Sequence, residues 1–398
     1  MAVAGERQAT AWGPVTLAVL GGVMAAVHVG KLPPALPLIR DELGIGLVAG
    51  GFVLSLFMLV GMLLALVIGA LAASIGRERL VLAGFACLIG GGIMGAQAAG
   101  LQALMISRLL EGVGFVAIGV SLPALVLAAS ARRDQDFTLG MWSVFTPLGM
   151  ALAMLAAPLA LSGLGWRGMW WAVAFLCLPM AVAILWQMRA LALPPPPRQA
   201  ALGVAREAVA SAGLRSVALV FGLYAFQWVT LMVWLPTFLT ESLGTGLEGA
   251  ALISAIVVLL NVPGCLLGGW LIRRGASARA LVIGGSLAMA ITAVFIFVPI
   301  LPVSGRLAAA MAFSFLGGLL PPSLFGCVPR MAPGPQHVSA GNGMLMQGSA
   351  AGQVAGAPLV AWAVSLAAGD WRFALVPMLA AALAAMLAAR PLPGRHLA

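Results

Sequence analysis

The chain has 398 residues, of which 62% are hydrophobic and only 8% are charged, and its formal net charge is +10. Soluble globular proteins carry about 25% charged residues and about 45–50% apolar ones. The composition therefore excludes a soluble domain, a disordered chain and a nucleic-acid-binding module. The four cysteines lie in long apolar runs without metal-ligand spacing and are typical of small core residues; they are Cys87, Cys177, Cys265 and Cys327.

Long apolar runs recur along the whole chain. A helix needs about 20 apolar residues to cross a bilayer, and continuous runs favour helices over the alternating pattern of a transmembrane β-barrel. We therefore predict an all-α polytopic membrane protein whose first run is retained, because no A-x-A cleavage pattern follows it. Twelve spans are predicted, at 13–36, 47–72, 80–99, 101–127, 137–161, 168–188, 214–236, 246–272, 279–300, 304–329, 340–366 and 371–389.

The placement of the basic residues predicts the orientation of these spans. An even number of spans puts both ends of the chain on one side, and basic residues concentrate in cytoplasmic loops. Most of the arginines in loops lie on the side of the termini, and the loops on the other side hold Arg40, Arg167, Arg306 and Arg372. We expect a multi-pass protein of the cell (inner) membrane with both termini in the cytoplasm.

His28 and Lys31 lie near the end of the first span, one helical turn apart, and Lys31 is the only lysine of the chain. A charge inside a span costs about 2.5–3.5 kcal/mol on insertion scales, so it is a candidate functional group. Two interpretations stay open for Lys31. Its ammonium extends to the headgroups of the outer face, or it faces a cavity and, with His28, binds an anionic substrate. For His28, simple packing competes with a role in proton transfer.

The fourth span contains the only acidic residue found in any span, Glu111, with Arg108 three positions earlier. This spacing places both side chains on one helical face, where they can pair. One interpretation is a structural ion pair that fixes the span to a neighbour. The other is proton coupling, in which Glu111 carries the proton and Arg108 tunes its release.

A Pro-rich and then basic stretch divides the chain near its midpoint. We predict a cytoplasmic linker at 191–212 between a six-helix bundle at 1–190 and a second six-helix bundle at 213–398. The two halves repeat each other: LGIGL opens the second span and LGTGL opens the eighth, 200 residues later, and the same offset relates Gly69 to Gly269. Parallel repeats of this kind enclose a substrate site near the middle of the membrane.

The second half supplies further polar candidates for substrate contacts. The seventh span contains Tyr224, Gln227 and Trp228, the eighth contains Asn261 and the eleventh contains Gln347. Polar groups in spans contact neighbouring helices as often as ligands. Because the first and seventh spans are repeat equivalents, we expect the groups on the seventh span to face His28 and Lys31 across the cavity.

These features resemble the major facilitator superfamily. The loop after the second span matches the superfamily's loop motif at Gly69, Leu71, Gly76, Arg77 and Arg79. It differs at Ala73, where the family usually has Asp. The substitution puts the charge-relay part of the motif in doubt and leaves the glycine turn intact. The fourth span is similar to the Arg-x-x-Gln-Gly-x-Gly motif of proton-coupled members at Arg108, Glu111, Gly112 and Gly114. Within the family, the strings around Pro37 and Trp142 are similar to the cyanate-permease-like branch.

The resemblance implies twelve helices in two pseudo-symmetric bundles that transport a solute by alternating access. No Walker loop, metalloprotease motif or nucleophile elbow occurs, so we predict no enzyme, no cofactor, no metal site and no ATP-driven pumping by this chain alone. The predicted function is secondary active transport of a small polar or anionic solute, by proton-coupled uptake, with the solute, protons and the lipid bilayer as partners and a monomeric state. Two alternatives stay open: proton-coupled efflux of a hydrophobic compound, which 20 Met and 11 Trp would suit, and a non-transporting membrane receptor.

Overall fold

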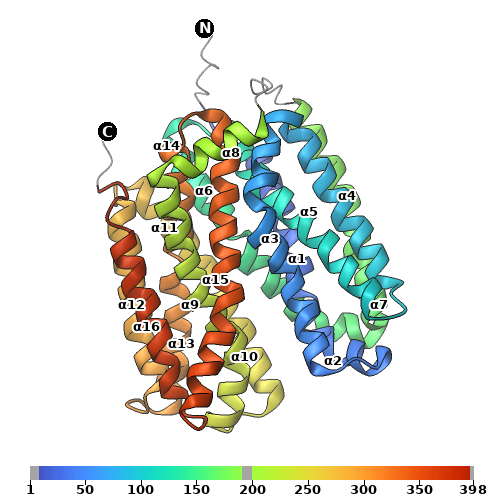
Figure 1. Ribbon diagram of the computed structural model, residues 1–398, viewed down its shortest axis with the longest axis vertical. Coiled ribbons are helices and arrows are strands. Elements are labelled where there is room, and N and C mark those ends of the chain that lie inside the picture. The colour runs from blue at the N-terminus through green and yellow to red at the C-terminus, as the bar shows by residue number, and fades with distance from the viewer. Residues whose placement is uncertain (1–8, 191–199, 395–398) are drawn as a thin grey trace.

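The computed structural model describes residues 9–190 and 200–394, and all regular structure in these ranges is helical (Figure 1). The Pro-rich part of the predicted linker, 191–199, lies outside the described residues. In the first half the helices are α1 (Trp12–Gly30), α2 (Leu32–Leu43), α3 (Leu47–Ile75), α4 (Arg77–Ala96), α5 (Leu101–Ala129), η1 (Arg132–Asp134), α6 (Gln135–Ser143) and α7 (Phe145–Ala190).

In the second half, the helix α8 (Ala201–Ala210) falls inside the predicted linker. It is followed by α9 (Ala212–Leu243), α10 (Leu247–Leu259), α11 (Asn261–Arg273), α12 (Ala278–Phe297), α13 (Val303–Gly317), α14 (Leu320–Met331), η2 (Pro335–His337), α15 (Val338–Leu366), η3 (Trp371–Ala374) and α16 (Leu375–Ala388).

The apolar runs become spans because a helix satisfies all of its own backbone hydrogen bonds in hydrocarbon. Within the described residues, 11 helical stretches are long and apolar enough to cross a membrane. One of them, Arg132–Arg189, is 58 residues long and breaks at Gly165, whose φ of 66° is left-handed. Divided at this glycine it supplies two spans, so the predicted twelve-helix fold is confirmed.

Several spans consist of two shorter helices. The first span breaks at Lys31, between α1 and α2, just before Pro33 and Pro34. The tenth breaks between α13 and α14, just before Pro321 and Pro322. Proline has no backbone N–H and cannot continue the hydrogen-bond ladder of the preceding turn, so both breaks follow directly from the sequence.

Most helices of the two halves lie on opposite sides of the molecule, whereas α6 packs against α11 and α14 of the second half. In Figure 1, α1, α3, α4, α5 and α7 lie on one side, and α9, α12, α13, α15 and α16 lie on the other. The first and last described residues lie at the same end of the molecule as α8. We call this the closed end, because the two halves meet there, whereas the tips of α2 and α10 at the opposite end lie apart.

Small residues bring the two halves into contact at the closed end. A Cβ atom on Gly140 of α6 would lie 2.7 Å from the Cα of Gly269 of α11. A Cβ atom on Gly69 of α3 would lie 3.1 Å from the Cα of Ala340 of α15. Gly69 and Gly269 are the pair related by the offset of 200 residues, and each packs against a helix of the opposite half.

Ion pairs join the two halves beside these glycines. Arg273 of α11 contacts Asp134 of η1 at 3.0 Å, and Arg330 of α14 contacts Asp136 of α6 at 2.7 Å. Arg77 of the loop motif reaches the carbonyl oxygen of Pro335 in the other half, at 3.5 Å. These pairs were not predicted, because nothing in the sequence indicates which loop of one half lies against which loop of the other.

The loop after α3 supplies a first testable prediction. Gly76 has a φ of 91° and a ψ of 148°, with free space around its missing side chain, so a substitution is opposed by backbone strain of about 1–3 kcal/mol rather than by a clash. Gly76→Val should therefore lower the transport rate more than the affinity for solute. Ala73 is only 2% exposed, so Ala73→Asp should give no gain in rate. Initial uptake rates over a range of solute concentrations check both, and a large gain for Ala73→Asp would contradict our interpretation of the loop.

Candidate functional site

A cavity lies between the two halves and encloses about 840 Å³ of empty space, its open mouth included. Aromatic residues line it from both sides. None of the described residues that line it is charged. The first half contributes Val29, Phe57, Met58, Phe115, Phe145 and Met150, among others, and the second half contributes Phe221, Tyr224, Trp228, Asn261, Phe325 and Gln353, among others.

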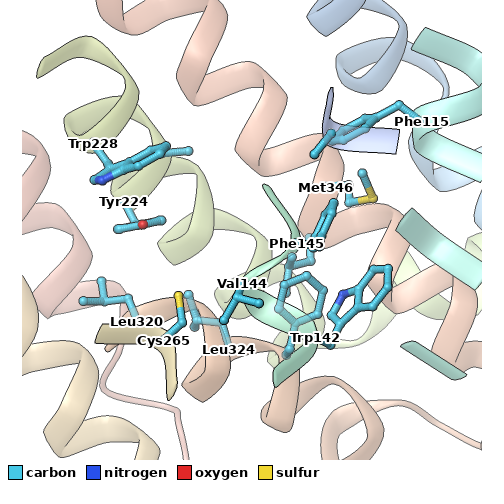
Figure 2. Close-up of a cluster of buried hydrophobic side chains, with 14 of the residues drawn as sticks. Phe115, Trp142, Val144, Phe145, Tyr224, Trp228, Cys265, Leu320, Leu324 and Met346 are labelled. Atoms are coloured by element: carbon cyan, nitrogen blue, oxygen red, sulfur yellow. The ribbon is translucent and has the colours of Figure 1, made fainter. Parts of the chain in front are cut away.

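Two aromatic walls form the sides of the cavity. On α9, the rings of Phe221 and Tyr224 stack with centroids 5.8 Å apart, and those of Tyr224 and Trp228 stack at 6.4 Å. These residues recur at helical spacing, so they share one face of α9. On the first half, Phe115 lies 5.3 Å from Phe57 by ring centroids. Figure 2 shows Phe115 opposite Tyr224 and Trp228.

Hydrogen bonds hold the wall on α9 in place. Trp228 donates from Nε1 to the Ser314 hydroxyl at 2.9 Å. Asn261 donates from Nδ2 to the Tyr224 hydroxyl at 3.1 Å and to the Ser314 carbonyl oxygen at 2.8 Å. Since buried polar groups cost free energy unless they are paired, this network fixes both rings and leaves their faces toward the cavity.

An aromatic floor separates the cavity from the closed end. Trp142 is completely buried and stacks on Phe145 at 4.6 Å. It also meets Phe325 of the other half edge to face, at 6.5 Å between ring centroids. Figure 2 shows Trp142 and Phe145 beside Met346. The floor is therefore built by both halves, and it can open only if they separate.

Four ionisable side chains meet inside the first half, outside the lining of the cavity. Glu111 of α5 pairs with Arg108 of the same helix, and its Oε1 lies 2.6 Å from the Lys31 Nζ and 2.9 Å from the His28 Nδ1. All four residues are at most 1% exposed. We call His28, Lys31, Arg108 and Glu111 the buried ion cluster. One carboxylate thus ties the end of α1 to the middle of α5.

Aromatic rings cover the two cations of the cluster. The Lys31 Nζ lies 4.4 Å from the ring centroid of Trp170, and the Arg108 guanidinium lies 4.5 Å from that of Phe57. Arg108 also donates to the carbonyl oxygen of His28 at 2.9 Å. Phe57 lines the cavity, so one aromatic ring separates the Arg108 guanidinium from the cavity.

Helix α4 approaches the cluster closely because it presents glycines. A Cβ atom on Gly91 would lie 2.8 Å from the Glu111 Cγ, and one on Gly92 would lie 2.9 Å from the Ala174 Cβ of α7. The short separation leaves no space for a side chain between α4 and the cluster. A buried ion pair depends on its own geometry for compensation.

The predicted site residues divide into two groups in the structure. Tyr224, Trp228 and Asn261 line the cavity. Gln227 instead donates to the carbonyl oxygen of Leu223, and Gln347 donates to that of Met62, at 3.2 Å and 2.8 Å. Gln227 therefore satisfies a backbone group of its own helix, and Gln347 satisfies one of the neighbouring helix α3.

His28 and Lys31 do not face the seventh span as expected. Neither lines the cavity, and the fully buried Lys31 does not reach the surface, so neither interpretation of Lys31 describes the structure. The reason is the ion pair: Glu111 holds the ammonium inside the first half at 2.6 Å. The pairing of Arg108 with Glu111 forms as the spacing predicted.

The phenylalanines of the cavity were missed in the sequence. Phe57, Phe115 and Phe145 come from three different spans, where a phenylalanine that faces lipid has the same sequence pattern as one that faces solute. Their positions become apparent only when the helices are packed.

Comparison with known proteins gives the family. The profile described as Major Facilitator Superfamily matches residues 18–334. An uncharacterised MFS-type transporter of Mycobacterium tuberculosis is 30% identical over 203 residues, which cover 50% of this chain and 29% of that protein. The galactose-proton symporter of Escherichia coli is 25% identical over 183 residues, 46% of this chain and 38% of that protein. The chain thus matches well under half the length of these relatives.

Solved structures share the fold over nearly the whole chain. The human organic anion transporter MFSD10 has a TM-score of 0.77 at 16% identity, and the match covers 95% of this chain and 99% of that transporter's chain. The fucose:proton symporter FucP of E. coli has a TM-score of 0.74 at 16% identity, over 95% and 98%. The matched proteins are transporters and not enzymes. From the profile match over most of its length and the twelve-helix fold, the chain belongs to the Major Facilitator Superfamily.

Proposed function

We propose that this protein is a secondary active transporter that carries a small uncharged solute through the cavity, coupled to protons. The observation that carries the proposal is the lining of the cavity: two aromatic walls, with no charge among the described lining residues. An anion would find no cation there, since Lys31 and Arg108 are held by Glu111. The proposal therefore replaces the anionic solute expected from the sequence by a neutral one.

The mechanism that we propose is alternating access between two bundles, residues 1–190 and 213–398. In this structure the halves are packed together at the closed end by the contacts of Gly140 with Gly269 and of Gly69 with Ala340. We place the protein in the inner membrane with both termini in the cytoplasm. The closed end is then cytoplasmic, and the structure corresponds to an outward-facing state. Parting the glycine contacts and the aromatic floor would open the cavity to the cytoplasm.

Proton coupling is proposed at the buried ion cluster. An ion cluster inside a membrane protein marks a proton or ion pathway by default. The name of one relative, the galactose-proton symporter, supports an uncharged polar solute. Efflux of a hydrophobic compound is the second candidate, favoured by Met58, Met150 and Met346 in the lining, because methionine adapts to varied apolar ligands.

A panel of solutes decides between these classes. Proteoliposomes with an imposed proton gradient would be offered D-galactose, D-xylose, benzoate as an organic anion, and a neutral aromatic dye. Accumulation of a sugar would support uptake of a polar solute, and proton-driven extrusion of the dye would support the second candidate. Accumulation of benzoate alone would contradict the proposal. Transport of any of these compounds that does not depend on the proton gradient would contradict it as well.

The wall on α9 gives a prediction for the binding of solute. Trp228→Ala should weaken the binding of a transported solute roughly two- to tenfold, because an aromatic contact contributes about 0.5–1.5 kcal/mol beyond the area it buries. Gln227→Ala, one residue away, is the matched control, since Gln227 does not line the cavity. Binding measured by solute-induced tryptophan fluorescence or by equilibrium dialysis checks it. Equal losses in both variants would show that Trp228 acts through packing alone.

A further inference from the structure

We propose that the coupling proton is carried by Lys31, with Glu111 as its permanent counter-ion, and not by Glu111 itself. This inference rests on the proposed function as a proton-coupled transporter. It names the group within the buried ion cluster whose charge changes during the cycle.

The first argument is the charge balance of the cluster. It contains two cations, Lys31 and Arg108, and one carboxylate, Glu111, all almost completely removed from the surface. A guanidinium does not lose its proton in a protein. With Lys31 protonated, the sum of the three charges is therefore +1, and with Lys31 as a neutral amine it is zero. Protonating Glu111 instead would leave two adjacent cations and a sum of +2.

Burial decides between these alternatives. Uncompensated charge in a low-dielectric interior is costly. Titration of Lys31, which changes the net charge of the cluster between 0 and +1, therefore costs less than titration of Glu111, which changes it between +1 and +2. The Arg108–Glu111 ion pair is intact in both favoured states. Lys31 is thus the group whose proton can leave without breaking the remaining pair.

The second argument is the set of groups that face Lys31. Arg108 and Glu111 come from α5 and His28 comes from α1, with its Nδ1 3.2 Å from the Lys31 Nζ. Cys177 comes from α7 and lies 3.4 Å from the other ring nitrogen of His28. Helix α4 presents glycine here, and α3 presents Phe57 to Arg108. Among the described residues, no second carboxylate contacts Lys31 to balance the extra cation.

His28 completes the arrangement, because a neutral imidazole can act as donor or acceptor at Nδ1. With Lys31 as ammonium, Nδ1 accepts from it, and the other nitrogen donates to the Cys177 sulfur. With Lys31 as amine, the imidazole can carry its hydrogen on Nδ1 and donate to Glu111, 2.9 Å away. Both protonation states of Lys31 therefore leave Glu111 with hydrogen-bond partners.

The position of Lys31 connects its charge to the cavity. Lys31 is the residue at which α1 ends and α2 begins. Two residues earlier, Val29 lines the cavity, and a Cβ on Gly30 would lie 2.7 Å from the Cα of Met150, another lining residue. Loss of the Lys31–Glu111 ion pair weakens the attachment of the end of α1 to α5 and leaves the hydrogen bonds of His28 to Arg108 and Glu111. The charge of one side chain thus biases the packing of a helix that shapes the site.

The test uses the fact that Lys31 is the only lysine of the chain. Protein labelled with lysine carrying ¹⁵N at the side-chain nitrogen, purified as the full chain in lipid nanodiscs, gives a single side-chain signal whose shift distinguishes ammonium from amine. We expect this signal to change from ammonium to amine within the pH range over which proton-driven uptake operates. A signal that stays at the ammonium position throughout, while proton-driven uptake occurs, overturns the assignment.

Two variants sharpen the result. Glu111→Gln removes the counter-ion and should move the transition to lower pH, whereas Arg108→Gln removes a neighbouring cation and should move it to higher pH. The exposed Arg79→Gln is the control and should leave it unchanged. A transition that occurs at the same pH in the native protein and in both cluster variants overturns the assignment. Should either variant fail to fold, the titration of the native protein still decides.

The outcome is separable from that of the proposed function. Lys31→Arg keeps the positive charge but cannot release it, so proton-driven accumulation of a sugar should fall to background, while exchange of labelled for unlabelled sugar continues. Accumulation preserved in Lys31→Arg removes Lys31 from the coupling and returns the proton to Glu111. Absence of proton-driven transport of every uncharged solute of the panel in the native protein contradicts the proposed function instead, whatever the titration shows.

Discussion

Replacing Glu111 with glutamine should destabilise the folded protein by about 3–5 kcal/mol, the usual cost of removing one partner of a buried ion pair. The carboxylate accepts from Lys31 and Arg108 at once, so the variant leaves two cations of the buried ion cluster without a counter-ion. Part of this cost is relieved if Lys31 gives up its proton, but Arg108 cannot. Denaturant titration of the native protein and the variant, both purified in lipid or mild detergent, measures the difference in their free energies of unfolding.

Glu42 provides the matched control for this prediction. It also forms an ion pair, with Arg167 at 2.8 Å, but the carboxylate is half-exposed. Exposed pairs contribute little to stability, so Glu42→Gln should change it by no more than the error of the measurement. Equal effects at both positions would mean that water or headgroups reach Glu111, and the buried ion cluster would lose its proposed role.

The second large effect concerns the contact at which the two halves meet. Gly140→Leu places a side chain where a Cβ atom alone would lie 2.7 Å from the Cα of Gly269. Overpacking of this kind costs about 1–3 kcal/mol, and every 1.4 kcal/mol changes a population about tenfold. We expect the closed end to be forced apart and the transport rate to fall about tenfold or more, with little change in the amount of folded protein.

Gly284→Leu is the control for this substitution. Gly284 lies within α12, and a Cβ atom placed there meets nothing within 4 Å. Both variants lose a glycine from a helix, so only the clash distinguishes them. Transport that survives in Gly140→Leu but fails in Gly284→Leu would contradict the proposed role of the contact.

The fold could be predicted from the sequence because the bilayer leaves few choices. Long apolar runs must form helices, and the prolines after Lys31 and in the first turn of α14 mark where spans break. The short helix α8 within the expected linker was not predicted, since a short amphipathic stretch depends on the surfaces it covers. Gly165 ends one helix and begins another without a loop, which the apolar pattern cannot indicate but which leaves the number of spans unchanged.

The site was predicted only in part, because contacts between distant helices decide it. The sequence placed Arg108 and Glu111 on one face by local spacing, and that pair forms. It could not show that Lys31 reaches the same carboxylate, since that contact depends on how α1 packs against α5. Among the polar residues of the seventh span, Tyr224 and Trp228 line the cavity but Gln227 does not, because Gln227 lies on another face of the helix.

Alternating access between the two halves is the central claim, and paired spin-label distances test it most directly. One pair would be Arg133→Cys with Arg274→Cys at the closed end, and the other Asp41→Cys with Ser242→Cys at the opposite end; all four side chains are exposed. Labels would be measured in nanodiscs with and without a transported solute, over a range of pH. The account predicts two populations in which a short distance at one end accompanies a long distance at the other. Distances that stay fixed at both ends, or that lengthen at both ends together, would contradict it.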